Sequence, residues 1–504
     1  MKILIATGLF PPDIGGPATY SKLLSDELPK GGVSVFVESF GSVRHMAKGI
    51  RHVAYAAKLL WSARDADVVF AQDTVSVGLP ALLVSYLLGK IFIVRVPGDY
   101  AWEQAVQRFG VRDSIDDFQN KRYGLRIELL RSIQKLVVRG ADRAVAPSVY
   151  FGGLVSRWSR NPDRIASIYN GIDIAQIRTA AAGVVVEPKT IVSAGRLVPW
   201  KGFGTLIRAM KKLDGWKLVI AGDGPEMPAL RKIIAAEGLS DRVSLAGRLS
   251  KDELIRLIAS ADIFALNTHF ESFSFQVVEA MAAGTPVIAT KVGNLAEIIT
   301  DGSEGLLVVP DSEDDFVRAI RRVSSDPALR HRFAEAGKKK AEMFSIERTV
   351  LATREVLDSL DKAPTPGLKR RQLVGKLVRY LFSGGVAAVT DLVLLYVFTD
   401  VAHIWYVASS VLAFLVAFGV SFFLQKFFTF QDNGTQGMRG QAAIYLAVTG
   451  TNLAINTGLI YLLVQYTGLH YLPAQILTSI IVAVESYVLY GMFIFKDKGG
   501  KAAQ

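Results

Sequence analysis

The sequence predicts an α/β protein with two parallel-sheet domains, followed by an all-α domain of four membrane-spanning helices. Two observations predict this class. Up to about residue 360, short runs rich in Val and Ile alternate with longer amphipathic stretches, which is the pattern of βαβ units. After Lys376 the composition changes, and long apolar segments follow one another to the end of the chain.

The composition bounds the classes of protein and of site. A chain of 504 residues is too long for one core. It has no cysteine, which excludes disulfides, thiolate catalysis and Cys-ligated zinc. Its six histidines show no HxxH or HExxH spacing, so we expect no metal site. A hydrophobic fraction of 50% predicts membrane segments, and the net charge of +12 suits an anionic membrane or phosphorylated substrates. No nucleic-acid motif accompanies that charge, so we expect no nucleic-acid partner.

Two series of strands define the α/β domains. The first series is KILIAT, VSVFVES, ADVVFAQ and IFIVRV, and the second is TIVSAGRL, WKLVIAGDG, RVSLAGRLS, ADIFALNT, TPVIAT and GLLVV. The opening run is interpreted as a buried strand and not as a secretory signal. An Asn-Gly turn in SIYNGIDIAQI marks a hinge near Asp173. We therefore expect domains at 1–173 and 174–345, a crossover helix and basic linker at 346–372, and a membrane domain at 373–504.

Four apolar segments in the membrane domain are each long enough to cross about 30 Å of hydrocarbon. They are Tyr380–Phe398, Trp405–Leu424, Ala442–Gln465 and Leu472–Phe495. Lys and Arg precede the first segment and follow the second and fourth, whereas the loops TDVAHI and YTGLHYLP contain neither. The positive-inside rule then places both termini and the α/β domains in the cytoplasm.

The membrane domain is predicted to be an internal duplication. A shift of 65 residues lays RYLFSGGVAAVTDLVLLYVF over IYLAVTGTNLAINTGLIYLL without a gap, and FFTFQD over MFIFKD. Tyr380 then corresponds to Tyr445, and Asp391 to Asn456. Two similar helical hairpins are therefore expected to form the four-helix unit.

Two glutamates in HFESFSFQVVEAMAAGTPVIAT, Glu271 and Glu279, indicate a ligand site. Glu271 follows the strand ADIFALNT, and Glu279 lies about one turn into the next helix. Ligands of open α/β sheets bind at such strand ends. The backbone N–H groups near Ser274 and Phe275 suit a phosphate, while carboxylates suit the hydroxyls of a sugar or ribose. Cations for a diphosphate are found in AGRLVPWKGFGTLI, where Arg196 and Lys201 follow another strand.

With GRLVPWKG, AGDGPE, NGID and the Glu-x7-Glu segment ESFSFQVVE, the chain resembles the retaining GT-B glycosyltransferases of family 4 over about residues 1–360. The resemblance implies two Rossmann-like domains that face each other across a cleft, with a nucleotide-sugar held mainly by the second. By this resemblance Arg196 and Lys201 hold the diphosphate, Glu279 binds the ribose hydroxyls and Glu271 contacts the donor sugar. The implied donor-binding set also contains Gly15 and Gly16 of FPPDIGGPATY, Gly247 beside the base, Ser274 and Phe275.

The implied reaction transfers a glycosyl group with retention of configuration and needs neither a metal nor another cofactor. Arg196 and Lys201 are expected to stabilise charge on the leaving diphosphate. The sequence departs from the family at two places. Serines stand at 272 and 274, where glycine is common, and Asp99 of RVPGDYAWE follows the fourth strand, where many members have histidine. We assign Asp99 a catalytic or acceptor-binding role, with a helix cap as the alternative.

Residues 373–496, with LFSGGVAAVTDLVLL, resemble the GtrA-like family, which is linked to polyprenyl-phosphate-bound sugars. Asp391 and Glu485 lie within predicted spans, where a carboxylate costs about 2.5–3.5 kcal/mol and requires a partner, water or a headgroup. Arg379 and Lys426 are expected at the cytoplasmic edge as phosphate ligands. These four residues form the predicted lipid or acceptor site. Basic amphipathic stretches around Arg51 and Arg131 are expected to contact an anionic bilayer.

The sequence therefore predicts an enzyme of the inner membrane that moves a sugar from a UDP- or GDP-linked donor to a polyprenyl phosphate or polyprenyl-diphosphate-linked acceptor. Two alternatives remain open. One is a transporter of lipid-linked sugars whose α/β part only recruits cargo. The other is a glycosyltransferase of a soluble glycan with a passive membrane anchor. A homo-oligomer is also left open.

Overall fold

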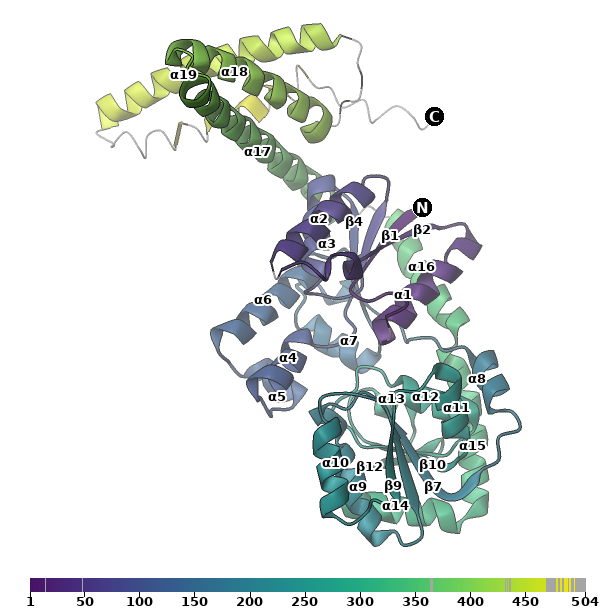
Figure 1. Ribbon diagram of the computed structural model, residues 1–504. Coiled ribbons are helices and arrows are strands. Elements are labelled where there is room, and N and C mark those ends of the chain that lie inside the picture. The colour runs from purple at the N-terminus through teal and green to yellow at the C-terminus, as the bar shows by residue number, and fades with distance from the viewer. Residues whose placement is uncertain are drawn as a thin grey trace. The chain divides into compact units, whose positions relative to one another are not determined.

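The chain in the computed structural model divides into two compact units (Figure 1). One comprises Met1–Ser85 and Lys90–Thr365, and the other comprises Tyr86–Gly89 and Pro366–Gln504. The structure describes residues 1–13, 15–47, 49–362, 366–430, 432, 434, 437–467, 477–478, 481–482, 485–487, 489–490 and 494.

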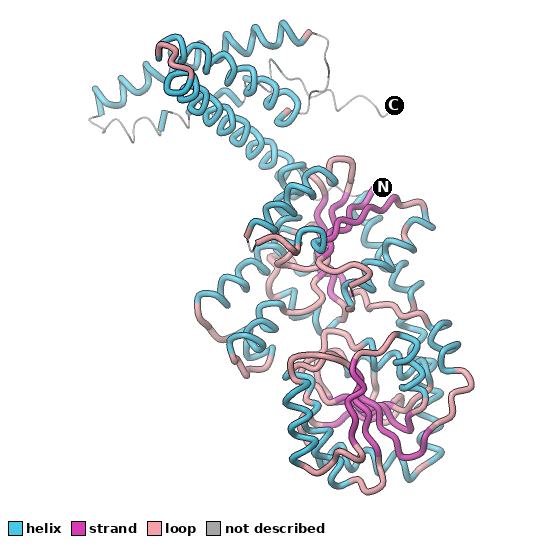
Figure 2. The backbone as a smooth tube through the Cα atoms, viewed as in Figure 1, coloured by secondary structure: helices cyan, strands magenta, loops and turns pink. Residues whose placement is uncertain are grey.

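The first domain of unit 1 is a six-stranded parallel sheet of order β2-β1-β3-β4-β5-β6 (Figure 2). Its strands are β1 (Lys2–Thr7), β2 (Ser34–Ser39), β3 (Val68–Ala71), β4 (Ile91–Arg95), β5 (Arg143–Ala146) and β6 (Ile165–Ser167). Its helices are α1 (Gly16–Glu27), α2 (Ile50–Ser62), α3 (Gly78–Leu88), α4 (Tyr100–Phe109), α5 (Ile115–Asn120), α6 (Leu125–Gly140) and α7 (Val149–Ser156). The four predicted strands are β1 to β4, whereas β5 and β6 were not predicted.

The second domain has a six-stranded parallel sheet of order β12-β11-β10-β7-β8-β9. The six predicted strands are all present as β7 (Glu187–Ala194), β8 (Lys217–Ala221), β9 (Val243–Gly247), β10 (Ala261–Leu266), β11 (Val287–Thr290) and β12 (Gly305–Val308). The helices are α8 (Ile174–Ala181), α9 (Phe203–Ala209), α10 (Met227–Ala236), α11 (Lys251–Ala259), α12 (Phe275–Ala283), α13 (Leu295–Ile298), α14 (Glu313–Ser325) and α15 (Pro327–Ala341).

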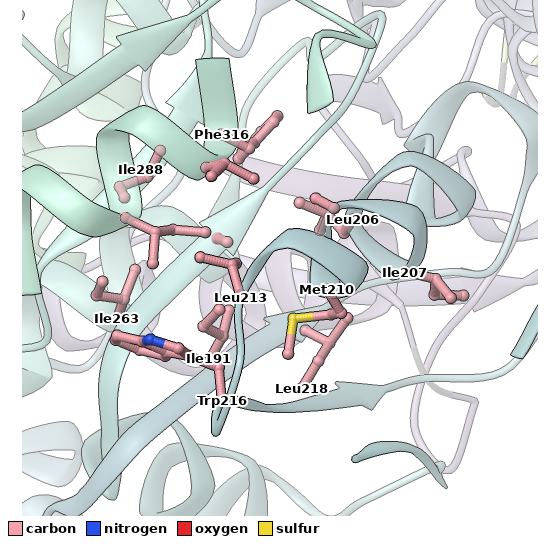
Figure 3. Close-up of a cluster of buried hydrophobic side chains, with 14 of the residues drawn as sticks. Ile191, Leu206, Ile207, Met210, Leu213, Trp216, Leu218, Ile263, Ile288 and Phe316 are labelled. Atoms are coloured by element: carbon pink, nitrogen blue, oxygen red, sulfur yellow. The ribbon is translucent and has the colours of Figure 1, made fainter. Parts of the chain in front are cut away.

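One face of the second sheet is sealed by an apolar core that continues onto α9, α10 and α14 (Figure 3). Ile191, Leu218, Ile263 and Ile288 project from four neighbouring strands, and Phe316 of α14 is fully buried with them. Because both faces of a parallel sheet are covered, its strands read as nearly continuous apolar runs, which is why they are recognisable in the sequence.

The last helix of unit 1, α16 (Ile346–Lys362), returns to the first domain. Its Val350, Leu357 and Leu360 are buried with Ile3 and Ile5 of β1. The chain therefore crosses between the two domains twice, after β6 and before α16.

The second unit is helical. It contains α17 (Pro366–Tyr396), which continues as a π-helix over Val397–Val401, and α18 (Tyr406–Phe423), which continues as a π-helix over Leu424–Thr429. The third helix is α19 (Met438–Thr467). Among the described residues two stretches are long and apolar enough to cross a membrane, Gly375–Val401 and Val411–Thr429. The third predicted span lies on α19, and the fourth, Leu472–Phe495, lies largely outside the described residues, so the number four stays a prediction.

A cluster of aromatic side chains joins corresponding parts of the predicted duplication. Tyr380 and Tyr445, which are 65 residues apart, are buried in one core with Phe422, Phe430 and Tyr490. The ring of Tyr490 lies 4.6 Å from that of Tyr445 and 6.1 Å from that of Tyr380. This common core is what two similar hairpins that pack on each other would produce.

One backbone contact in the second domain limits what residue can follow β8. Gly222 has φ +140°, and a Cβ atom there would lie 1.9 Å from the carbonyl oxygen of Gly195, after β7. We expect Gly222→Ala to lower the free energy of unfolding by about 2 kcal/mol or more. Gly238→Ala is the matched control, since Gly238 also has positive φ but has open space around it, and it should cost about 1 kcal/mol. Equal thermal-unfolding midpoints for the two variants would contradict this.

Candidate active site

Four of the predicted site residues of the second domain lie at or after the carboxyl ends of strands. Arg196 and Lys201 come after β7, Gly247 ends β9, and Glu271 comes after β10. These strands are parallel and belong to one sheet, so their carboxyl ends share one edge. Backbone hydrogen bonds join the loops at this edge, from Gly195 N–H to the Ala221 oxygen at 3.0 Å and from Gly222 N–H to the Gly247 oxygen at 2.7 Å.

Lys201 and Glu271 form a buried ion pair between Lys201 Nζ and Glu271 Oε1. The two side chains are 11% and 9% exposed, so water screens the pair little. Burial raises the pKa of Glu271 above its ordinary value, and the charge of Lys201 opposes that rise. The structure therefore joins the predicted phosphate cation to the predicted sugar-binding carboxylate.

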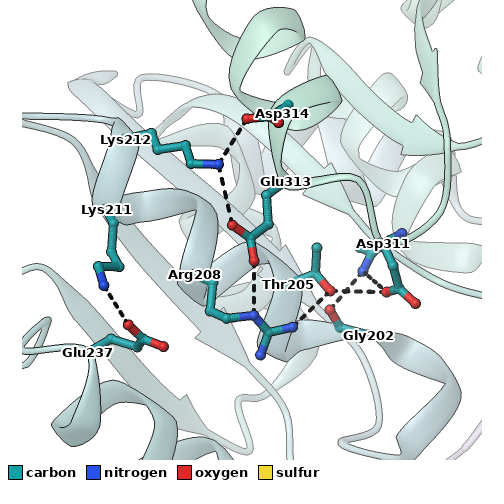
Figure 4. Close-up of polar contacts among 10 residues, drawn as sticks. Gly202, Thr205, Arg208, Lys211, Lys212, Glu237, Asp311, Glu313 and Asp314 are labelled. Atoms are coloured by element: carbon teal, nitrogen blue, oxygen red, sulfur yellow. Dashed lines mark hydrogen bonds and ion pairs between the residues drawn. The ribbon is translucent and has the colours of Figure 1, made fainter.

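A polar network holds the loop of Lys201 in place (Figure 4). Asn267, directly after β10, donates from Nδ2 to the Gly202 oxygen at 2.8 Å and to Asp311 Oδ1 at 3.1 Å. Thr205 at the start of α9 donates to the same Asp311 oxygen at 3.0 Å. His269 Nε2 lies 2.9 Å from Asp311 Oδ2. The network ties the loops after β7 and β10 together, which fixes Lys201 relative to Glu271.

Glu279 is buried in α12 and pairs with Lys251, a residue that the sequence reasoning missed. Lys251 begins α11, directly after the helix cap Ser250, which forms a capping box with Glu253. Lys251 is 44% exposed and Glu279 is 4% exposed. The one signal in the sequence for Lys251 is that RLSKDEL directly follows Gly247, which we predicted to lie beside the base.

Two buried oxygen atoms at this edge have no hydrogen-bond partner among the described residues. They are Ser274 Oγ, at the N-cap of α12, and Glu279 Oε2. A buried acceptor without a partner costs free energy, commonly about 1–3 kcal/mol. Such a pair of atoms is suited to hydroxyl or amide donors of a ligand. No group of three His, Asp or Glu side chains in the described part of the chain is arranged to hold a metal ion.

The glycine loop of the first domain reaches the donor site. Gly15 is the N-cap of α1 with φ +147°, and Gly16 is the first residue of that helix. A Cβ atom on Gly16 would lie 3.2 Å from the Phe275 ring, so glycine permits this close approach. The predicted residues Gly16 and Phe275, which are far apart in the sequence, therefore meet.

Asp99 is fully buried and acts as the N-cap of α4. One oxygen, Oδ1, accepts from Trp102 N–H at 3.1 Å and from Gln134 at 2.9 Å, and Oδ2 accepts from Gln119 at 2.8 Å. Burial raises the pKa of Asp99, while these hydrogen bonds lower it. Both oxygens are thus engaged inside the first domain, and this geometry favours a positioning role over the catalytic one that we predicted.

Glu103 lies one turn further along α4 and was not singled out from the sequence. Its pKa is raised to about 7: burial and then the nearby Asp99 raise it, and Arg196 of the second domain lowers it. Arg196 is itself exposed. The exposed Arg196 is therefore within electrostatic reach of a carboxyl group of the other domain.

The predicted lipid-site residues differ in their surroundings. Lys426 is fully buried in the π-helix Leu424–Thr429, and its Nζ contacts Asp432 at 2.7 Å and Gln441 at 2.8 Å. Arg379 is also buried and donates to the Thr429 oxygen at 3.3 Å. Asp391 and Glu485 are partly exposed. The structure brings Arg379 and Lys426 to one π-helical segment, where Lys426 is already neutralised by Asp432.

Comparison with known proteins identifies two regions. Residues 178–340 match the family model described as glycosyl transferases group 1, and residues 379–495 match that of the GtrA/DPMS transmembrane domain. The chain contains a group 1 glycosyl transferase domain and a GtrA/DPMS transmembrane domain. The glycosyl transferase match covers β7 to β12 and thus the whole edge that carries Lys201, Lys251, Glu271 and Glu279.

Curated relatives share the glycosyl transferase part. A D-inositol 3-phosphate glycosyltransferase of Nocardioides sp. is 32% identical over 250 residues, which are 44% of this chain and 55% of the relative. The lipopolysaccharide core biosynthesis glycosyltransferase LpsE of Rhizobium meliloti is 35% identical over 181 residues, or 36% and 52% of the two chains. The chain thus spans about half the length of these relatives.

Solved structures share the fold. Sucrose-phosphate synthase of Thermosynechococcus elongatus superposes with a TM-score of 0.60 and 20% identity, over 72% of this chain and 99% of the other. Anabaena Alr3699/HepE in complex with UDP superposes with a TM-score of 0.57 and 19% identity, over 71% of this chain and 100% of the other. Two parallel sheets with these neighbours are the expected GT-B architecture of the glycosyl transferase part.

The Lys251–Glu279 pair predicts a difference between two lysines. We expect Lys251→Met to lower the free energy of unfolding by about 1–3 kcal/mol, because it leaves a buried carboxylate unpaired. Lys211→Met is the matched control, since Lys211 pairs with Glu237 at the surface, and it should cost less than about 1 kcal/mol. Adding Glu279→Leu to Lys251→Met should recover part of the loss. Identical thermal-unfolding midpoints for the two single variants would contradict the pairing.

Proposed function

We propose that this chain is a membrane-bound, retaining glycosyltransferase. It moves a sugar from a UDP- or GDP-linked donor to a polyprenyl phosphate or polyprenyl-diphosphate-linked acceptor at the cytoplasmic face of the inner membrane. The observation that carries this proposal is the presence of two ion pairs, Lys201–Glu271 and Lys251–Glu279, on segments that follow strands of the second sheet. Ser274 Oγ and Glu279 Oε2 have no partners among the described residues.

The donor would bind with its diphosphate near Lys201 and Arg196. Glu279 keeps Oε1 on Lys251 and has Oε2 free for a ribose hydroxyl. Glu271 keeps one oxygen on Lys201, which holds it beside the phosphates and leaves its second oxygen for a hydroxyl of the donor sugar. HepE, which shares this fold, has been solved in complex with UDP and with UDP-glucose, so uridine donors are tested first.

The chemistry would follow from this arrangement. The bond between the anomeric carbon and the diphosphate breaks, and the acceptor oxygen bonds to that carbon on the same face. Its proton passes toward the departing diphosphate, which Lys201 and Arg196 stabilise as charge develops. The carboxylates position hydroxyls, and the reaction needs no metal in this scheme.

Surfaces of the first domain support an acceptor that comes from a bilayer. Helix α2 exposes Ile50, Val53 and Trp61 at 64%, 72% and 72%, beside the basic Arg51. Helix α6 exposes Leu125, Leu129 and Leu136 at 86%, 59% and 53%. Arg131, which we expected on this basic face, is instead buried and paired with Glu128. Apolar side chains among basic ones favour a membrane surface over plain solvent.

Glu279→Ala tests the donor site. We expect the donor KM to rise about 10- to 100-fold, because a charge-assisted hydrogen bond to the ribose is lost. The assay follows transfer of labelled sugar from UDP-glucose, UDP-N-acetylglucosamine or GDP-mannose to lipid acceptors in detergent. Glu237→Ala on the surface is the control. Unchanged turnover after Glu279→Ala, or no turnover of any donor by the intact chain, would contradict the proposal.

Truncation tests whether the membrane domain is needed for transfer to a lipid acceptor. A chain that ends at residue 362 keeps α16 and both parallel sheets. We expect it to retain nucleotide binding and to lose at least tenfold in transfer to a lipid acceptor, because acceptor and enzyme no longer share a membrane. Nucleotide binding is measured by calorimetry, and transfer by the labelled-sugar assay. Full transfer by the truncated chain would instead support a soluble glycan acceptor and a passive anchor.

A further inference from the structure

Helix α4 of the first domain is docked onto the donor loops of the second by an aromatic side chain. The Trp102 ring lies 5.3 Å from that of Trp200 and 5.2 Å from that of Phe270. Trp200 directly precedes Lys201, and Phe270 directly precedes Glu271. Trp102 Nε1 is held in turn by the Asp113 oxygen at 3.0 Å. Helix α4 therefore packs against the residues that directly precede Lys201 and Glu271.

A second contact joins the turn before α4 to the same loop. Ser272 Oγ, next to Glu271, donates to the Pro97 oxygen at 2.6 Å. The following residue, Gly98, has no side chain, and a Cβ atom there would lie 2.6 Å from Glu103 Oε1. The carboxyl group of Glu103 therefore lies against a turn that is itself bonded to the donor loop.

The charges that act on Glu103 come from both domains. Asp99, at the N-cap of the same helix, and Arg196, from the donor loop, are the charged groups with an effect on the pKa of Glu103. Tyr100 is the adjacent hydroxyl, and Asp73 acts on that tyrosine. No hydrogen bond of the Glu103 carboxyl group is found within the described part of the chain, so the hydrogen-bonding capacity of this carboxyl group is unused there.

We propose that Glu103 binds the acceptor: its carboxylate accepts a hydrogen bond from a hydroxyl of a lipid-linked sugar beside the donor site. This rests on the proposed function and selects between the two acceptor classes left open there. The geometry that carries it is the anchoring of α4 on Trp200 and Phe270, together with the contact of Glu103 with the Pro97–Gly98 turn.

The negative charge of Glu103 favours a hydroxyl over a phosphate as the acceptor group that faces it. A phosphate acceptor would bring a second anion beside Glu103 and the buried Asp99, and like charges at close range repel. Arg196, the cation that acts on Glu103, is already required by the leaving diphosphate. A sugar hydroxyl is neutral and donates to a carboxylate, as at Glu271 and Glu279.

Acceptor kinetics of the intact chain test the proposal. Glu103→Ala should lower kcat/KM for a polyprenyl-diphosphate-linked monosaccharide about 10- to 100-fold, and Glu103→Gln should lower it less. Binding of UDP and hydrolysis of the sugar nucleotide without acceptor should be unchanged in both. Arg108→Gln, an exposed site on the same helix, is the control. Polyprenyl phosphate should be a poor acceptor for the unaltered chain.

The pH dependence gives a readout that a structural role would not move. The carboxylate is the binding form, so kcat/KM for the lipid-linked sugar should be high above and fall below the Glu103 pKa of about 7. Glu103→Gln should remove this acidic limb while the thermal-unfolding midpoint stays the same.

Four results would overturn the inference about Glu103. They are unchanged acceptor kinetics in Glu103→Ala, an unchanged acidic limb in Glu103→Gln, parallel loss of UDP binding, or exclusive use of polyprenyl phosphate. Failure of the proposed function would look different, because the intact chain would then neither bind nor hydrolyse any sugar nucleotide tested.

Discussion

The buried ion pair between Lys201 and Glu271 is the interaction on which the candidate site depends. Its members lie on loops after two adjacent strands, β7 and β10, and removing either would leave the other charge buried without a partner. Burying charge is costly, so the pair is tolerated only where the surrounding backbone is rigid. That rigidity comes from Asn267, which binds the Gly202 carbonyl, and from the glycines whose backbones touch across the ends of β7 and β8.

The second ion pair, Lys251 with Glu279, has the same form but a different exposure. Both carboxylates are buried and each meets one lysine through one oxygen, but Lys251 is four times as exposed as Lys201, at 44% against 11%. Water therefore weakens the outer pair more than the inner one. An outer lysine that can move is compatible with a nucleoside entering beside Glu279, whereas the inner pair stays fixed where sugar and phosphate would meet.

Most of the strands could be predicted from the sequence, and the failures have physical reasons. Buried parallel strands are uninterrupted Val/Ile runs, so ten of the twelve were recognisable. β5 (RAVA) and β6 (IAS) have only one Val or Ile each, so neither forms the apolar run that marks the other strands. Residues after strand ends were predicted because parallel strands align those ends. Lys251 and Glu103 were missed because neither stands in a recognised motif and each reaches the site only through tertiary packing. Asp99 illustrates a different ambiguity, since aspartate is equally suited to capping a helix and to binding a hydroxyl.

Contacts between the two α/β domains explain how the first domain can contribute to a site built on the second. Glu297 of α13 accepts hydrogen bonds from the backbone N–H groups of Val149 and Tyr150 at the start of α7, and from the Tyr169 hydroxyl at 2.8 Å. A carboxylate at a helix N-terminus is electrostatically favoured. Trp102 adds aromatic packing on Trp200 and Phe270. The hydrogen bonds of Glu297 are directional and fix the orientation of the two α/β domains. The aromatic packing of Trp102 is apolar and holds the domains in contact. A group on α4 is thereby held at a constant place relative to the strand ends of the second sheet, which is the condition for an acceptor residue to act on a donor bound by the other domain.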